Sequence, residues 1–184
     1  MPRRRKPDSA LVIIDMINAL DFPGGAGLLR QALPAARRIA RIKQRLKAAG
    51  VPAIYVNDNF THWREDFGEL VAICSQDDIL GAPLARALPP ENDDYAILKP
   101  QHSAFYNTPL EVLLRQLGID TVILTGTAGD SCVLASAFDA RMRDFEVVVP
   151  RDCVASITAQ RNRSALAVMK AMELSVTTSA RVRA

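Results

Sequence analysis

Three residues that lie far apart in the sequence, Asp15, Lys99 and Cys132, carry side chains that together could hydrolyse a carbonyl compound. A cysteine attacks a carbonyl carbon as the thiolate, and a neighbouring cation or a helix N-terminus stabilises that anion. A carboxylate within reach can accept the thiol proton and later return it to the leaving group. The set thus contains a nucleophile, an acid–base group and a positive charge, as hydrolysis through a covalent intermediate requires.

The elements that would position these residues are short apolar runs alternating with longer stretches of helical pattern. This alternation is typical of βα units that feed a parallel sheet covered by helices on both faces. The sequence therefore predicts an α/β fold, a three-layer αβα, doubly wound and mostly parallel sheet of Rossmann-like type with six strands. The six expected strands cover residues 10–14, 53–56, 95–98, 121–124, 146–149 and 175–178.

Helix boundaries can be read from proline, glycine and capping residues. The first helix is expected over residues 34–49, before Gly50. A capping box at residues 108–111, with Pro109 at the first helical position, predicts a helix that Gly118 ends. Further helices are expected over residues 65–76, 131–142 and 158–173, whereas the prolines in residues 80–90 favour a loop.

The expected strands bring the three reactive residues to one edge of the sheet, where open parallel sheets bind ligands. Asp15 follows the first strand, Lys99 follows the third, and Cys132 lies in the first turn of the helix after the fourth. Taken singly, they could be a turn aspartate, a solvated lysine and a small buried residue. Their joint placement favours a catalytic site, in which backbone N–H groups of the strand–turn–helix connection stabilise an oxyanion.

Three separated motifs carry a resemblance to a known family. Residues 11–16 read LVIIDM, residues 99–108 contain the core SAF, and residues 125–133 read TGTAGDSCV, and the similarity continues through residues 137–140 to Asp152. In order and spacing they resemble the signature regions of isochorismatase-like cysteine hydrolases. The resemblance covers nearly the whole chain after the first eight residues.

The resemblance implies a catalytic triad carried here by Asp15, Lys99 and Cys132. It also implies a cis peptide bond between Thr127 and Ala128, with the N–H groups of Ala128 and Cys132 forming the oxyanion hole. The implied reaction is thiolate attack, loss of ammonia or an amine, and hydrolysis of the resulting thioester by water.

The substrate is less determined than the triad. Nicotinamidases of this family bind a metal through an Asp-x-His pair and a further histidine, whereas residues 57–63 here read NDNFTHW and the chain has two histidines in total. We therefore expect no metal and no cofactor, with Asp58 and His62 as weak candidates for metal ligands. Isochorismatases hydrolyse a vinyl ether without needing the cysteine, so Cys132 favours cleavage of a C–N bond in a small amide, ureido or carbamoyl substrate.

Three alternatives stay open: isochorismatase-type hydrolysis of a vinyl ether, a metal-dependent nicotinamidase, and a catalytically silent binding module. Five residues on the loops around the expected site are candidates for the substrate pocket. They are Phe22, Asn57, Trp63, His102 and Phe105, although Trp63 and Phe105 could equally be packing residues.

Length and composition predict the domain organisation and exclude some classes of partner. With 184 residues, of which 49% are hydrophobic and 23% charged, the chain predicts one globular domain over residues 9–184 after a flexible basic tail over residues 1–8. Basic and aromatic residues do not interleave, and no apolar run approaches the roughly 20 residues that span a bilayer, so neither nucleic acid nor membrane is an expected partner.

The cysteines and the resemblance suggest where and with what the protein works. Three cysteines without a C-x-x-C pair predict no disulfide framework and fit a reducing, cytoplasmic location without a signal peptide. The expected partner is a small-molecule substrate. The family resemblance further implies a homo-oligomer, a dimer or a tetramer.

Overall fold

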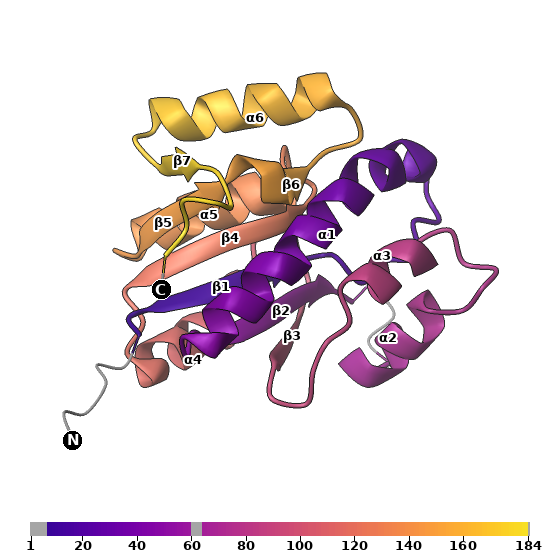
Figure 1. The fold of residues 1–184 in the computed structure, drawn as a ribbon, viewed down its shortest axis with the longest axis horizontal. Coiled ribbons are helices and arrows are strands. Elements are labelled where there is room, and N and C mark those ends of the chain that lie inside the picture. The colour runs from indigo at the N-terminus through magenta and orange to yellow at the C-terminus, as the bar shows by residue number, and fades with distance from the viewer. Residues whose placement is uncertain (1–6, 60–63, 184) are drawn as a thin grey trace.

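A parallel sheet forms the centre of the protein. The computed structural model describes residues 7–59 and 64–183, and within them seven strands pair in parallel in the order β3-β2-β1-β4-β5-β7, with β6 paired to β4 (Figure 1). The strands are β1 (Ser9–Ile14), β2 (Ala53–Asp58), β3 (Tyr95–Lys99), β4 (Thr121–Thr127), β5 (Glu146–Pro150), β6 (Val154–Ala155) and β7 (Ser175–Thr177).

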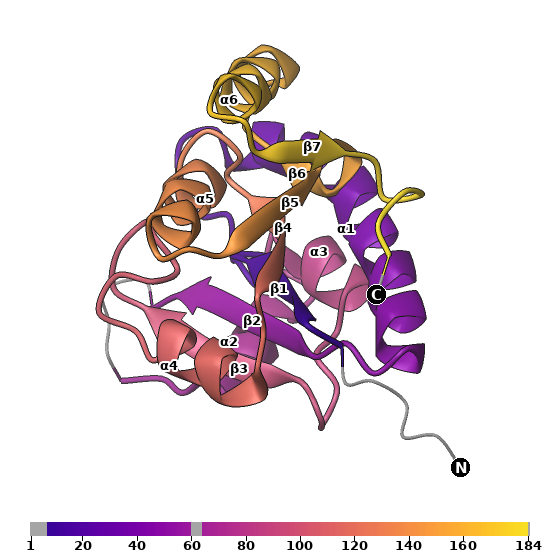
Figure 2. The same cartoon turned by 90° about the vertical axis from the view of Figure 1, so that its left-hand side faces the viewer.

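Helices cover both faces of this sheet. Figure 2 shows α1 and α3 on one side and α4 and α5 on the other, while α6 lies beside β7. Buried residues of α2 pack in the same core cluster as those of α1. The helices are α1 (Gly25–Ala48), α2 (Phe67–Cys74), α3 (Ala82–Ala87), α4 (Leu110–Leu117), α5 (Cys132–Met142) and α6 (Ala159–Ala171), and a short 3₁₀ turn, η1 (Arg151–Cys153), precedes β6.

The central strand β1 explains why the sheet needs cover on both faces. Val12 and Ile14 pack into the core beneath α4 and α5, whereas Leu11 and Ile13 pack against α1. A strand buried on both faces is apolar throughout, unlike one that has a solvated face. Within residues 7–59 and 64–183, no helix is both long and apolar enough to cross a bilayer.

A buried ion pair joins α1 to the segment before β3. The ammonium of Lys43, 2% exposed, contacts the carboxylate of Asp94, whose side chain is 1% exposed. The same carboxylate accepts a second charge-assisted bond from Lys47, at 2.8 Å. Lys43 also donates to the Tyr55 hydroxyl at 3.3 Å and to the Pro89 carbonyl at 3.1 Å, so its charge is compensated inside the protein.

The predicted fold class is confirmed, and each of the six expected strands is present. The strand that was missed, β6, has two residues, which is too short to show a periodic pattern. The prediction of a loop over residues 80–90 was wrong, because α3 begins with Pro83 in its first turn and buries Leu84 and Ala85.

Two helix starts differ from the prediction. Helix α1 begins at Gly25 and contains Pro34, because buried residues such as Leu28 and Ala32 continue its apolar face upstream of the proline. The expected capping box of α4 is absent: Pro109 is the N-cap, and the Glu111 carboxylate accepts a bond from Arg143 at 3.0 Å. The predicted ends at Gly50 and Gly118 agree with the structure, since both adopt positive φ after their helices.

Candidate active site

The ends of β1 and β4 meet at the point where the strand order reverses. Ile14 pairs with Gly126, so Asp15 and Thr127 emerge side by side, and the Thr127 hydroxyl donates to the Asp15 carbonyl at 3.0 Å. Gly126 has φ 114°, and a Cβ added there would lie 2.0 Å from the Ile14 carbonyl oxygen. Only glycine allows this approach, at the position where doubly wound sheets bind ligands.

We predict that Gly126→Ala lowers the free energy of unfolding by at least about 2 kcal/mol, from backbone strain at positive φ together with the clash. Gly118→Ala is the matched control: Gly118 has φ 72°, but a Cβ there would meet no atom within 4 Å. Strain alone should cost about 1 kcal/mol at that position. Urea unfolding of both variants checks the difference, and equal losses would contradict the steric argument.

A buried ion pair forms the floor of the site. The Lys99 ammonium lies 2.9 Å from Asp15 Oδ2, and the two side chains are 0% and 7% exposed. Asp15 adopts φ 50°, a conformation uncommon outside glycine, and its Oδ1 accepts a bond from the Asp58 N–H at 2.7 Å. Lys99 also donates to the Gln101 carbonyl at 3.1 Å and lies 3.5 Å from Asp58 Oδ2. Each polar atom of the pair therefore has a defined partner.

The thiol of Cys132 completes the group. Cys132 is the first residue of α5, and its Sγ lies 3.6 Å from Lys99 Nζ, while the Asp15 carboxylate is within hydrogen-bonding reach of the thiol. The three residues chosen from the sequence thus meet at one edge of the sheet.

The protonation states of this group differ from the sequence-based expectation. Burial and the charge of Asp15 raise the pKa of Cys132 to about 12, and the opposing effect of Lys99 is smaller. Lys99 does lower the pKa of Cys132, as expected for a cation beside a thiol, but burial and the charge of Asp15 outweigh it, so the thiol form is favoured in the resting protein. Burial also raises the pKa of Asp15, although Lys99 opposes it.

For Lys99, burial acts to lower the pKa, but the charges of Asp15 and Cys132 outweigh it and raise the pKa. A neutral thiol thus lies beside a carboxylate whose basicity is increased and an ammonium that stays charged. This arrangement suits transfer of the thiol proton to Asp15 during attack rather than before it.

The two backbone N–H groups named as the oxyanion hole, those of Ala128 and Cys132, belong to the turn between β4 and α5 and to the start of α5. The peptide bond between Thr127 and Ala128 is cis, and the Ala128 carbonyl accepts bonds from the N–H groups of Ser131 and Val133. In the part of the chain that the structure describes, no acceptor bonds to the N–H groups of Ala128 and Cys132. Both groups are therefore available to an oxyanion.

The candidate pocket residues differ in how close they lie to Cys132 and in their exposure to solvent. His102 is exposed, and its Nδ1 lies 3.7 Å from Cys132 Sγ and 3.3 Å from Ser131 Oγ. Phe22, 40% exposed, lines a cavity described below. Trp63 and His62 lie outside the described residues.

Two of the candidate pocket residues have their side chains inside the protein. The Asn57 side chain is fully buried and bonds to both backbone groups of Ile17, accepting at 3.1 Å and donating at 2.7 Å, so it holds the loop after β1. Phe105 is 5% exposed and packs 5.9 Å from the Phe145 ring, centroid to centroid, as a core residue.

A cavity of about 640 Å³ lies on the α2 face of the sheet. Its wall includes Asn18, three residues after Asp15, and Asn59, which follows β2, together with Leu70 and Cys74 of α2. The lining of this cavity does not include Asp15, Lys99 or Cys132.

The weak metal candidate Asp58 has its charge engaged elsewhere. Its carboxylate lies 3.5 Å from the Lys99 ammonium, which would repel a cation held by the same oxygens. Among the residues that the structure describes, no three His, Cys, Asp or Glu side chains cluster as a metal site would require.

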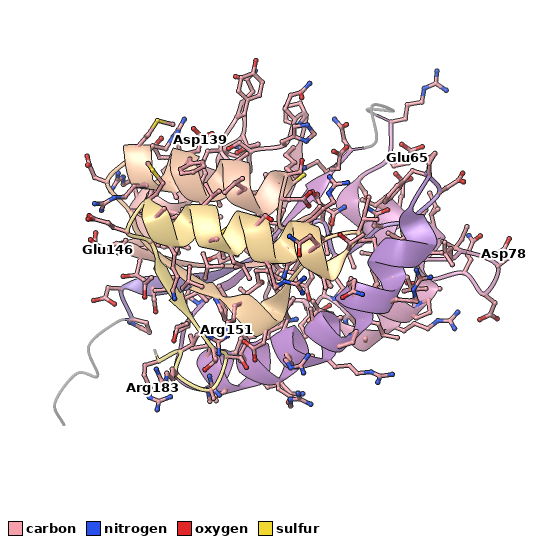
Figure 3. All side chains as sticks on the ribbon, turned by 90° about the horizontal axis from the view of Figure 1, so that it is seen from above. Glu65, Asp78, Asp139, Glu146, Arg151 and Arg183 are labelled. Atoms are coloured by element: carbon pink, nitrogen blue, oxygen red, sulfur yellow. The ribbon has the colours of Figure 1, made fainter. Side chains whose placement is uncertain are left out.

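Sequence reasoning missed the contacts that tie the segment after β3 to α5. The Ser103 hydroxyl donates to Asp139, which extends from α5 (Figure 3), and the Ala104 N–H donates to Ser136 Oγ at 2.9 Å. Ser136 Oγ in turn donates to the Cys132 carbonyl at 2.6 Å. The spacing of Cys132 and Ser136 by four residues, one helical turn, was a signal for this contact.

Comparison with known proteins agrees with this geometry. A model of the Isochorismatase domain matches residues 9–181. The chain is 36% identical over 165 residues to the isochorismatase family protein YaaI of Bacillus subtilis, covering 90% of each chain. It is 32% identical over 157 residues to a maleamate amidohydrolase of Pseudomonas putida, covering 82% of this chain and 72% of that protein. The N-carbamoylsarcosine amidase structure from Thermoplasma acidophilum matches with a TM-score of 0.73 and 27% identity, covering 97% of this chain and 100% of that one.

Proposed function

This chain belongs to the isochorismatase family, and we propose that it is a cysteine hydrolase that cleaves a C–N bond of a small amide, ureido or carbamoyl compound. The observation that carries the proposal is the convergence of Cys132 Sγ, Lys99 Nζ and the Asp15 carboxylate, with separations of 2.9 Å between the two charges and 3.6 Å between sulfur and ammonium. A buried nucleophile, an acid–base group and a cation in contact are the requirements of covalent hydrolysis.

In the proposed acylation, Asp15 accepts the thiol proton as Cys132 Sγ attacks the carbonyl carbon of the substrate. The N–H groups of Ala128 and Cys132 stabilise the oxyanion. Asp15 then gives the proton to the nitrogen, the C–N bond breaks, and ammonia or an amine leaves. Throughout, Lys99 stabilises first the carboxylate and then the developing thiolate, because it lies beside both. The product of these steps is a thioester on Cys132, which water hydrolyses.

Two observations support an amide-type substrate. Relatives named maleamate amidohydrolase and N-carbamoylsarcosine amidase act, by those names, on small compounds with an amide or carbamoyl group. The cavity of about 640 Å³ has room for a small compound, and its wall carries the amides of Asn18 and Asn59 together with the carboxylates of Asp21 and Glu65.

The test is an ammonia-release assay with maleamate, N-carbamoylsarcosine and nicotinamide, and isochorismate as a vinyl ether without a scissile amide. Cys132→Ala is expected to lower kcat/KM for the active amide by at least about a thousandfold. Cys153→Ala, which removes a buried thiol outside the site, should retain activity. Full activity of Cys132→Ala would refute the proposal.

Intact-protein mass spectrometry during turnover should show an acyl adduct, and peptide mapping should place it on Cys132. Turnover of isochorismate without an adduct would favour the vinyl ether hydrolase instead. One equivalent of bound metal, together with activity on nicotinamide, would favour the nicotinamidase. Absence of substrate turnover together with an unreactive Cys132 would favour a binding module.

A further inference from the structure

The Cys132 sulfur has one buried cationic neighbour and one exposed imidazole neighbour. Lys99 Nζ lies 3.6 Å from Sγ and is fully buried, as is nearly all of Asp15. His102 Nδ1 lies 3.7 Å from the same sulfur, but its side chain belongs to an exposed residue. The imidazole is therefore the contact of the nucleophile that solvent reaches.

The position of His102 relative to the sulfur is determined by the fold. The next two residues, Ser103 and Ala104, are bonded to Asp139 and Ser136 of α5, the helix that carries Cys132. Ser131 Oγ, 3.3 Å from Nδ1, holds the ring from the N-cap of the same helix. In the tautomer that carries its proton on Nε2, Nδ1 has a lone pair that can accept a proton beside the sulfur.

The second half of the proposed reaction needs such an acceptor. This inference rests on the proposed thioester mechanism. Water is a weak nucleophile, and a base positioned beside the thioester must accept its proton as it attacks. Asp15 is 5% exposed and engaged by Lys99 and the Asp58 N–H, whereas His102, an exposed residue, has its Nδ1 3.7 Å from the sulfur. We propose that His102 is a catalytic residue, the base that activates water for deacylation of Cys132.

In this step the water oxygen forms a bond to the carbonyl carbon of the thioester, and one water proton passes to His102 Nδ1. The tetrahedral intermediate then collapses, the C–S bond breaks, and the electron pair of that bond remains on sulfur. The proton on Nδ1 passes to the Cys132 thiolate at the 3.7 Å contact. The products are the free carboxylic acid and the resting thiol, with no other reactant consumed.

The test uses 4-nitrophenyl acetate as the acyl donor, because its leaving group departs without protonation and acylation and deacylation separate in time. In His102→Gln we expect a burst of one nitrophenolate per Cys132 at the wild-type rate, followed by steady turnover about a hundredfold slower. The acetyl-enzyme should accumulate in mass spectra. Hydroxylamine, which attacks thioesters without a base, should restore turnover. Tyr106→Ala, an exposed residue of the same segment, is the control and should behave as wild type.

Two results for His102→Gln would overturn the assignment. Equal losses in the burst and in steady turnover would indicate a role in acylation or binding. A burst rate and a steady turnover rate equal to those of the wild type would show that the imidazole has no role. Cys132→Ala run in parallel separates this inference from the proposed function. An undiminished burst in Cys132→Ala would refute the cysteine mechanism itself. Acetylation confined to Cys132, combined with wild-type deacylation in His102→Gln, would refute only the role of the histidine.

Discussion

Asp15→Asn is expected to lower kcat/KM by at least about a thousandfold and, at the same time, to increase the rate at which iodoacetamide alkylates Cys132. Turnover falls because asparagine can neither accept the thiol proton nor protonate the leaving nitrogen. Alkylation rises because the charge of Asp15 is one cause of the raised pKa of Cys132, whereas Lys99 lowers it. Without the carboxylate, a larger fraction of Cys132 is thiolate at pH 8 to 9.

The measurement is the pH dependence of Cys132 alkylation, followed by peptide mass spectrometry so that the buried Cys74 and Cys153 are counted separately. In Asp15→Asn the alkylation profile should shift to lower pH. Lys99→Met should have the opposite effect on alkylation, because it removes the cation: the alkylation profile should shift to higher pH. This variant should also lose turnover. Shifts in the same direction for both variants would contradict the electrostatic account of the site.

Asp94→Asn is expected to lower the free energy of unfolding by about 3 kcal/mol, the largest stability effect that we predict. The substitution leaves the Lys43 ammonium, 2% exposed, with Glu91 Oε1 at 3.1 Å as its remaining carboxylate partner. Because the Glu91 side chain is 53% exposed, it compensates the buried charge less well. A buried charge that loses its partner carries its full cost of desolvation.

Asp93→Asn provides the control for that experiment. Asp93 accepts a bond from Lys47 at 2.6 Å, as Asp94 does at 2.8 Å, but its side chain is 75% exposed. Urea unfolding should show a large loss for Asp94→Asn and little change for Asp93→Asn. Similar losses for the two variants would mean that burial does not determine the strength of this cluster.

The convergence of Asp15, Lys99 and Cys132 could be predicted because it depends on chain topology. Parallel strands place their carboxyl ends at one edge, so the order of strands and the residue after each are enough to bring the side chains together. The pKa of Cys132 depends on how deeply the thiol is buried and on its distance from Asp15. These quantities come from tertiary packing, and local sequence does not reveal them.

Side-chain direction accounts for the burial of two candidate pocket residues. Asn57 and Phe105 were expected on the loops around the site, but Asn57 turns towards Ile17 and Phe105 towards Phe145. The start of helix α1 was also mispredicted from a local signal, the proline. Packing of the apolar residues upstream of Pro34 overcomes the cost of a proline within the helix. In each case a long-range contact outweighed the local preference.

The pairing of Ile14 with Gly126 has a consequence for folding of the protein during its synthesis on the ribosome. More than a hundred residues separate these partners, and loop closure of that length delays their contact until β4 has been synthesised. Asp15 leaves the ribosome long before Cys132, so a nascent chain carries the acid–base group without its nucleophile. If the proposed mechanism holds, activity requires β4 to dock on β1, so the appearance of activity during synthesis should report that these two strands have paired.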